Sequence, residues 1–153
     1  MSEMMAGGCL CGLVRYEIVP GNFLELICHC RMCQKQSGAP LTGVMFVDLE
    51  NLQVTSGTAR IYQSSARGER SFCGNCGSPM FWQPFGSHRR AVFVGSLDDP
   101  NAFRPAYHIC TSGAVSWLHV EDDLPRYPEK PPEMRPTLSY DSVTGKAVER
   151  DLA

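Results

Sequence analysis

The spacing of the cysteines limits the fold of this chain more than any other feature of the sequence. Seven of its eight cysteines fall into three groups, with the spacings C-x-C, C-x-C-x-x-C and C-x-x-C. Cysteines at C-x-C spacing bridge one another only with strain, so a disulfide framework explains these groups poorly. In a reducing compartment, closely spaced thiols are typical of metal sites. The groups are Cys9 and Cys11, then Cys28, Cys30 and Cys33, then Cys73 and Cys76, with Cys110 alone.

The two outer pairs together supply four thiolates, which is the ligand number of a closed structural zinc site. Glycines frame both pairs, in GGCLCG and FCGNCGS, and they suit tight turns that aim backbone N–H groups at sulfur. The three remaining thiols would leave a fourth position for water or substrate, as reactive zinc sites do. We therefore expect two zinc ions per chain, one held by Cys9, Cys11, Cys73 and Cys76 and one held by Cys28, Cys30 and Cys33.

Spacing alone leaves other arrangements open. Cys30 and Cys33 could instead join the last pair, and the triple could also be a structural site completed by a distant histidine or by Cys110. In the predicted strand AYHIC, His108 stands two residues before Cys110, so the two side chains would share a face. Each is more often a core residue than a ligand. His29 lies between two ligands, and we expect it at the surface.

Alternating apolar and polar residues predict an all-β fold with little helix. One short helix is expected around RMCQKQ, where the helix dipole would favour a thiolate at Cys33. A single helical turn is expected in SLDDPNAF. The expected strands are VRYEI, FLELIC, GVMFV, LQVTSG, ARIYQ, PMFWQ, AVFVG, YHIC and VSWLHV.

The length of the chain, 153 residues, and its composition indicate one soluble domain. We place this domain at residues 1–128, followed by a proline-rich arm or tail at 129–153. A formal charge of -2 gives no general attraction to nucleic acid. Because the sequence has neither an apolar run long enough for a membrane span nor a signal peptide, we expect a cytoplasmic protein without a membrane partner. The sequence does not indicate an oligomeric state.

Four segments, in this order, resemble the glutathione-dependent formaldehyde-activating enzyme family, also called the centromere-protein-V-like family. They are GGCLCGLVRYE, CHCRMCQKQSGAP, RSFCGNCGSPMFW and SWLHVEDDLPRYP. The resemblance implies an Mss4-like fold of small antiparallel sheets around a structural zinc. It also implies that Cys9, Cys11, Cys73 and Cys76 hold that structural zinc and that Cys28, Cys30 and Cys33 hold a catalytic one.

The resemblance further implies a carbon–sulfur lyase that joins glutathione and formaldehyde reversibly to S-hydroxymethylglutathione. Three thiolates leave a zinc site with a net charge of -1, which makes the metal a poor Lewis acid but a suitable holder of a substrate thiolate. A small thiol and an aldehyde are therefore the expected partners. Gln34, Lys35 and Ser37 follow the triple and are candidates for orienting such a substrate.

Two other classes of function compete with this hypothesis. In the first, both zinc ions are structural and the domain is a non-enzymatic module that binds another protein. In the second, weaker one, Cys110 carries out thiol redox chemistry, although no resolving-cysteine pattern stands near it in the sequence.

Overall fold

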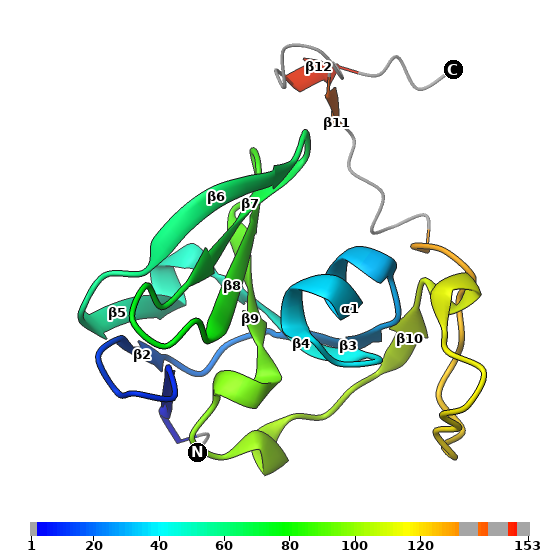
Figure 1. The fold of residues 1–153 in the computed structure, drawn as a ribbon, viewed down its shortest axis with the longest axis horizontal. Coiled ribbons are helices and arrows are strands. Elements are labelled where there is room, and N and C mark those ends of the chain that lie inside the picture. Colours follow the sequence, from blue (N-terminus) through cyan, green and yellow to red (C-terminus); the bar gives the residue numbers. More distant parts are fainter. Residues whose placement is uncertain (1–2, 132–137, 141–146, 150–153) are drawn as a thin grey trace.

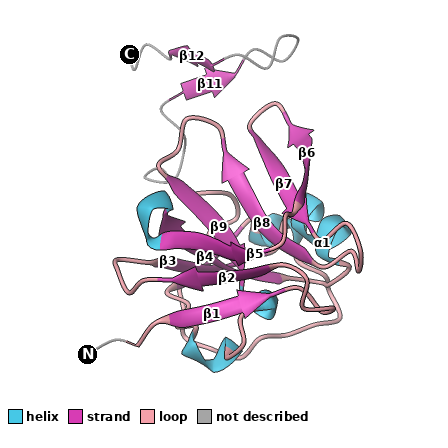
Figure 2. Cartoon of the chain, turned by 90° about the vertical axis from the view of Figure 1, so that its left-hand side faces the viewer, coloured by secondary structure: helices cyan, strands magenta, loops and turns pink. Residues whose placement is uncertain are grey.

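The computed structural model describes residues 3–131, 138–140 and 147–149, and its elements are mainly strands, which confirms the predicted fold class. Seven strands form the large sheet, in the order β10-β3-β4-β9-β8-β7-β6, and three form a smaller sheet, in the order β1-β2-β5 (Figure 1, Figure 2). The large sheet consists of β3 (Leu24–Cys28), β4 (Thr42–Asp48), β6 (Arg60–Ser65), β7 (Gly68–Phe72), β8 (Pro79–Pro84), β9 (Arg89–Phe93) and β10 (Tyr107–Ile109). The small sheet consists of β1 (Met5–Gly8), β2 (Arg15–Ile18) and β5 (Leu52–Ser56).

Helix is scarce, as expected. The helix predicted around RMCQKQ is α1 (Arg31–Ser37), which packs beside β4 (Figure 1). It ends at Gly38, whose left-handed φ of 70° lets its backbone N–H donate to the carbonyl oxygen of Gln34. The turn predicted in SLDDPNAF is a 3-10 helix at Pro100–Ala102. Further 3-10 turns lie at Leu49–Asn51, Val94–Ser96 and Thr111–Gly113.

The structure differs from the strand predictions at three segments. VSWLHV is not a strand, and Trp117 within it is 71% exposed, so its apolar letters do not mark a buried face. Strand β1 was not predicted because MAGG lacks alternation. Strand β7 was not predicted because its sequence, GERSF, is largely polar, yet Arg70 and Ser71 within it are buried.

The strand pairs of both main sheets are antiparallel except β10 with β3, which is parallel and sets Ile109 opposite Cys28. Because parallel neighbours need a long connection, this pair joins segments far apart in the sequence. It places the end of β10 beside the triple of cysteines at the end of β3.

The described part of the predicted tail is short. Its strands β11 (Leu138–Tyr140) and β12 (Ala147–Glu149) pair antiparallel with each other, and the rest of the chain after residue 131 lies outside the described residues. The division at residue 128 stays a prediction. None of the helices within the described ranges combines the length and apolar character needed to span a membrane.

The core has two parts, and each contains one set of cysteines. The first includes Cys9 and Cys73 and is centred on Tyr16 and Phe81, whose rings meet edge to face at 5.0 Å. The second includes Cys28 and Cys33 with apolar residues of β3, β4, β9 and β10. The buried thiols of each predicted metal centre therefore pack against the apolar core, whereas Cys11 of the first centre is exposed.

Phe81→Ala should reduce the free energy of unfolding by about 3 to 5 kcal/mol, because Phe81 is 1% exposed and its loss leaves a cavity against Tyr16. Ile61→Ala on the outer strand β6 is the control, since Ile61 is 58% exposed, and its effect should stay within about 0.5 kcal/mol. Urea unfolding of the zinc-loaded proteins measures the free energy of unfolding of both variants. Equal losses would mean that the core is not centred on Phe81.

Candidate metal centres

The first centre joins the two outer pairs of cysteines. The thiols of Cys9, Cys11, Cys73 and Cys76 all lie within 4.8 Å of one another. The Sγ atoms of Cys9 and Cys11 are 3.5 Å apart, and those of Cys11 and Cys73 are 3.8 Å apart. A tetrahedron with the usual zinc–sulfur bond length separates its sulfur atoms by about 3.8 Å. The donor set and its spacing therefore fit a closed four-thiolate zinc site.

Turns on either side of this centre aim donors at the sulfur atoms. The backbone N–H of Val14 donates to Cys9 Sγ at 3.2 Å. Gly77, with φ of 77°, closes the second turn by donating from its N–H to the carbonyl oxygen of Cys73. Hydrogen bonds from the hydroxyl and backbone N–H of Ser78 lower the pKa of Cys76 to about 5. These donors favour thiolates, as metal binding requires.

The second centre lies where β3 passes into α1. Cys28 is the last residue of β3, Cys30 caps the N-terminus of α1, and Cys33 lies in its first turn. Their thiols lie within 4.8 Å of one another, so the structure groups the triple together and does not divide it between two sites. Three convergent soft donors suit zinc. Cys30 has a second role, because its Sγ accepts the backbone N–H of Cys33 at 3.3 Å.

The three thiols of this centre differ in their electrostatics. Hydrogen bonds from Cys28 and then Cys33, with the nearby charge of Arg70, lower the pKa of Cys30 well below its ordinary value. The pKa of Cys28 is raised far above its ordinary value, first because its thiol bonds to Cys110. Without a bound cation, a negative charge on one thiol of the cluster opposes the ionisation of the next thiol.

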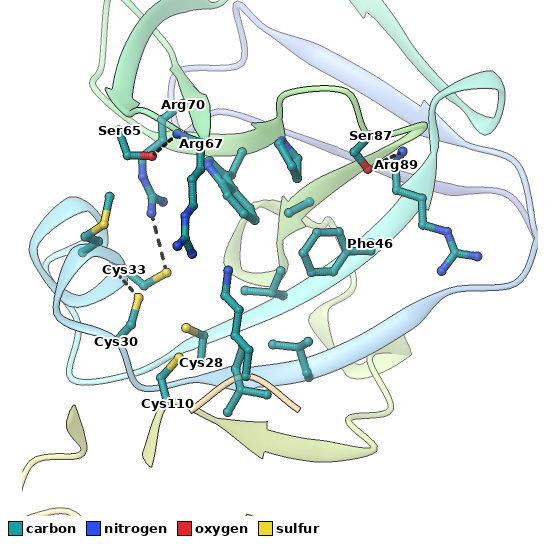
Figure 3. A pocket seen from close by; sticks show the side chains of 18 of the residues that line it. Cys28, Cys30, Cys33, Phe46, Ser65, Arg67, Arg70, Ser87, Arg89 and Cys110 are labelled. Carbon is teal, nitrogen blue, oxygen red and sulfur yellow. Dashed lines mark hydrogen bonds between the residues drawn. The ribbon is translucent and has the colours of Figure 1, made fainter. Parts of the chain in front are cut away.

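Cys110 lies against the second centre, where sequence spacing had left its position open. It is the one residue other than glycine with a positive φ within the described chain, at 55°, and a hydrogen bond with Cys28 lowers the pKa of its thiol. Figure 3 shows the two thiols beside each other. It does not belong to the group of three mutually close thiols. The expectation that His108 and Cys110 share a face was wrong, because β10 ends at Ile109 and the chain turns at Cys110.

His29 is buried rather than at the surface, which corrects the expectation for it. It is 8% exposed, and its Nε2 lies 2.8 Å from Nδ1 of His108. The other ring nitrogen of His108 lies 3.0 Å from Oδ2 of Asp122. Both nitrogens of His108 are therefore engaged away from the thiols, so His108 does not complete the triple. A partner remote in sequence explains why His29 could not be placed from its neighbours.

The polar residues that follow the triple have structural contacts. The side-chain amide of Gln34 donates to the carbonyl oxygens of His29 and Gly113, both at 2.8 Å. The hydroxyl of Ser37 donates to the carbonyl oxygen of Cys33 at 2.7 Å, and Lys35 is exposed. None of the three candidates Gln34, Lys35 and Ser37 is among the described residues that line the adjacent cavity.

A cavity of about 780 Å³ opens beside the second centre. Its wall is mainly apolar and includes side chains of β3, β4, β8 and β9 (Figure 3). Its described lining contains no carboxylate but four cationic side chains. Those residues are Arg67, Arg70, Arg89 and Lys130, and the thiols that reach the cavity are Cys28, Cys30, Cys33 and Cys110. A site of this kind suits an anionic ligand with an apolar part.

Comparisons with known proteins agree with the cysteine pattern. The family model described as "Glutathione-dependent formaldehyde-activating enzyme" matches residues 4–113. A protein of Halomonas elongata, named "Putative glutathione-dependent formaldehyde-activating enzyme", is 25% identical over 128 residues, which are 77% of this chain and 82% of the relative. A crystal structure of a Rhodobacter sphaeroides protein, a structural genomics target, is similar with a TM-score of 0.50 and 26% identity, and covers 64% of this chain and 94% of that one.

The two centres should respond differently to loss of a ligand. The first joins two segments more than sixty residues apart, as the Cys11–Cys73 separation of 62 shows, whereas all ligands of the second come from one short stretch. Cys76→Ser should unfold the domain, because structural zinc contributes roughly 10 to 16 kcal/mol, about as much as a whole domain's net stability. Cys30→Ser should stay folded with one zinc instead of two, since serine still caps α1. Thermal melts and zinc analysis of the two variants test this expectation. Unfolding of Cys30→Ser would show that the zinc site of the triple is structural.

Cys110→Ser tests whether a fourth thiol is a permanent ligand of the second centre. Because Cys110 stands outside the mutually close triple, we expect the variant to retain two zinc ions and to lose zinc to a chelator at the wild-type rate. Cys28→Ser is the comparison and should lose one zinc ion. Loss of one zinc from Cys110→Ser would instead show a closed site with four thiolates.

Proposed function

We propose, from the premise that the chain belongs to the glutathione-dependent formaldehyde-activating enzyme family, that it is a zinc-dependent carbon–sulfur lyase. It would join a small anionic thiol, such as glutathione, to an aldehyde and cleave the adduct reversibly. The observation that carries the proposal is the position of the three-thiol centre at the wall of a cavity lined by cations and apolar side chains. A purely structural zinc needs no such cavity.

Cys28, Cys30 and Cys33 would hold the zinc of this second centre, and Cys9, Cys11, Cys73 and Cys76 would hold the structural zinc. When bound at the second centre, zinc keeps a substrate thiol in its nucleophilic thiolate form. The apolar wall around the thiols limits the access of water, which strengthens electrostatic interactions inside the cavity.

The cationic side chains that line the cavity differ in the interactions that they already make. Arg89 already donates from Nε to Asp48 at 2.8 Å, and Lys130 lies over the ring of Trp82 at 5.3 Å. Arg67 is exposed and is without a carboxylate partner among the described residues. Its side chain points toward the cavity beside Arg70 (Figure 3). Arg67 is thus placed to attract a carboxylate at the outer end of a thiol substrate.

The activity is tested by NMR exchange between free thiol, aldehyde and adduct, with glutathione or neutral 2-mercaptoethanol as the thiol and formaldehyde or a larger apolar aldehyde as acceptor. Zinc-loaded protein should accelerate exchange, and Cys30→Ser, which should remain folded, is the matched inactive control. Larger aldehydes are included because the cavity wall is apolar. No rate above the spontaneous one with any pair would favour a protein-binding module instead.

Arg67→Met should raise KM for glutathione by up to about fivefold, equivalent to about 1 kcal/mol for an exposed charge pair, while kcat stays unchanged. With 2-mercaptoethanol, which carries no carboxylate, the same substitution should have no effect. Higher ionic strength should reproduce the variant's effect on KM in the wild-type protein, because salt screens exposed charges. An equal change with both thiols would contradict carboxylate binding at Arg67.

A further inference from the structure

Arg70 is a buried cation at the boundary between the cavity and the second centre. It is 4% exposed, and its guanidinium lies 5.8 Å from the ring centroid of Phe93. Its Nη2 donates to Sγ of Cys33 at 3.8 Å, and Figure 3 shows the side chain pointing from β7 toward that sulfur. Within the described residues, no carboxylate forms an ion pair with it.

One nitrogen of this guanidinium has unused hydrogen-bonding capacity. Nη1 of Arg70 is buried and has no acceptor among the described residues. Burying an N–H of a charged group without an acceptor is costly, so such groups are rare in folded proteins and call for an explanation. Since the side chain lines the cavity, the missing acceptor can come from a ligand bound there.

The position of Arg70 determines which oxygen atom of a bound ligand its guanidinium can contact. A substrate sulfur held among Cys28, Cys30 and Cys33 would place its carbonyl carbon one bond away and the carbonyl oxygen two bonds away. Nη2 lies 3.8 Å from one of these sulfur atoms and the side chain lines the cavity, so the guanidinium stands within reach of that oxygen. The carboxylates of glutathione are many bonds from its sulfur and reach outward, toward Arg67.

We propose that Arg70 is a catalytic residue that donates through Nη1 to the aldehyde oxygen during formation and cleavage of the carbon–sulfur bond. This inference rests on the proposed function. As the thiolate attacks the carbonyl carbon, the C–S bond forms and the π electron pair of C=O moves onto oxygen. The resulting alkoxide takes one proton from water and becomes the hydroxyl of the adduct, while the thiol's own proton has already been released to solvent. The reverse reaction follows the same steps backward.

Arginine suits this role because its guanidinium keeps its charge and offers several fixed donors. One N–H stays on Cys33 while another meets the developing negative charge, so the donor needs little reorganisation during the reaction. A lysine would offer a single flexible ammonium group and would satisfy the two acceptors less well.

The kinetic test compares Arg70→Met and Arg70→Lys with Arg90→Met. Arg90 is the matched control, because it lies on β9, two strands from β7 in the same sheet, stacks at 5.7 Å on Phe81 and does not line the cavity. Arg70→Met should lower kcat by roughly 100- to 1000-fold, as expected when one donor to a developing oxyanion is removed. It should keep two zinc ions and the wild-type KM for glutathione. Arg70→Lys should lose less activity, and Arg90→Met should lose none.

A binding test that needs no turnover uses two glutathione derivatives. S-acetylglutathione carries a carbonyl oxygen two bonds from sulfur, and S-ethylglutathione lacks it. Calorimetry with zinc-loaded wild-type protein should show tighter binding of the acetyl compound, and Arg70→Met should bind both equally. If Arg70→Met proves too unstable for these measurements, Arg70→Lys carries the test and should show a reduced acetyl preference.

The outcomes separate this inference from the proposed function. An unchanged kcat or an unchanged acetyl preference in the folded variants would overturn the role of Arg70 alone. Loss of one zinc ion from Arg70→Met would also overturn it, since Arg70 would then serve to hold Cys33. A wild-type protein that exchanges no thiol with any aldehyde would overturn the proposed function itself.

Discussion

The convergence of four thiols between two distant turns is the constraint on which the rest of the structure depends. The four thiols lie within 4.8 Å of one another, so as thiolates they would repel one another unless a cation were bound among them. The turn that carries Cys73 directly follows β7, and Arg70 lies three residues before that cysteine. Fixing the first centre therefore also fixes the strand that carries the buried cation of the second. In this way the first group of thiols can influence the electrostatics of the second through the strand that joins them.

Charge is distributed unevenly around the second centre, and this distribution restricts its chemistry. As thiolates, the three cysteines would supply negative charge, while the charged side chains in the described lining of the cavity are all cationic. The guanidinium of Arg70 lies 3.8 Å from the sulfur of Cys33. A ligand that enters must therefore tolerate thiolates at one end and cations along the path. An anionic thiol meets both conditions, whereas a cationic ligand would be repelled along the cavity wall.

Local features and the grouping of the outer cysteine pairs were predictable from the sequence, whereas the other contacts between distant segments were not. The spacing of the cysteines predicted both groups of thiols, and the helix at Arg31–Ser37 followed from its local pattern. The approach of Cys110 to Cys28 depends on parallel pairing of β10 with β3, which no local pattern records. The burial of His29 depends in the same way on His108. Arg70 escaped notice because a polar strand such as GERSF resembles a loop until the groups that bury it are known.

The chain of contacts from His29 through His108 to Asp122 supports the loop that carries the three thiols of the second centre. His29 lies between two of the cysteines, so its buried hydrogen bond to His108 at 2.8 Å restrains the loop that carries them. Asp122, whose pKa is lowered first by its hydrogen bond with His108, is held in turn by Arg126 at 2.9 Å. Support of this kind behind the ligands reduces their freedom to reorganise when a substrate enters or leaves. Because Cys28, Cys30 and Cys33 line the cavity whereas His29 and His108 do not, this support lies apart from the surface that a ligand in the cavity would meet.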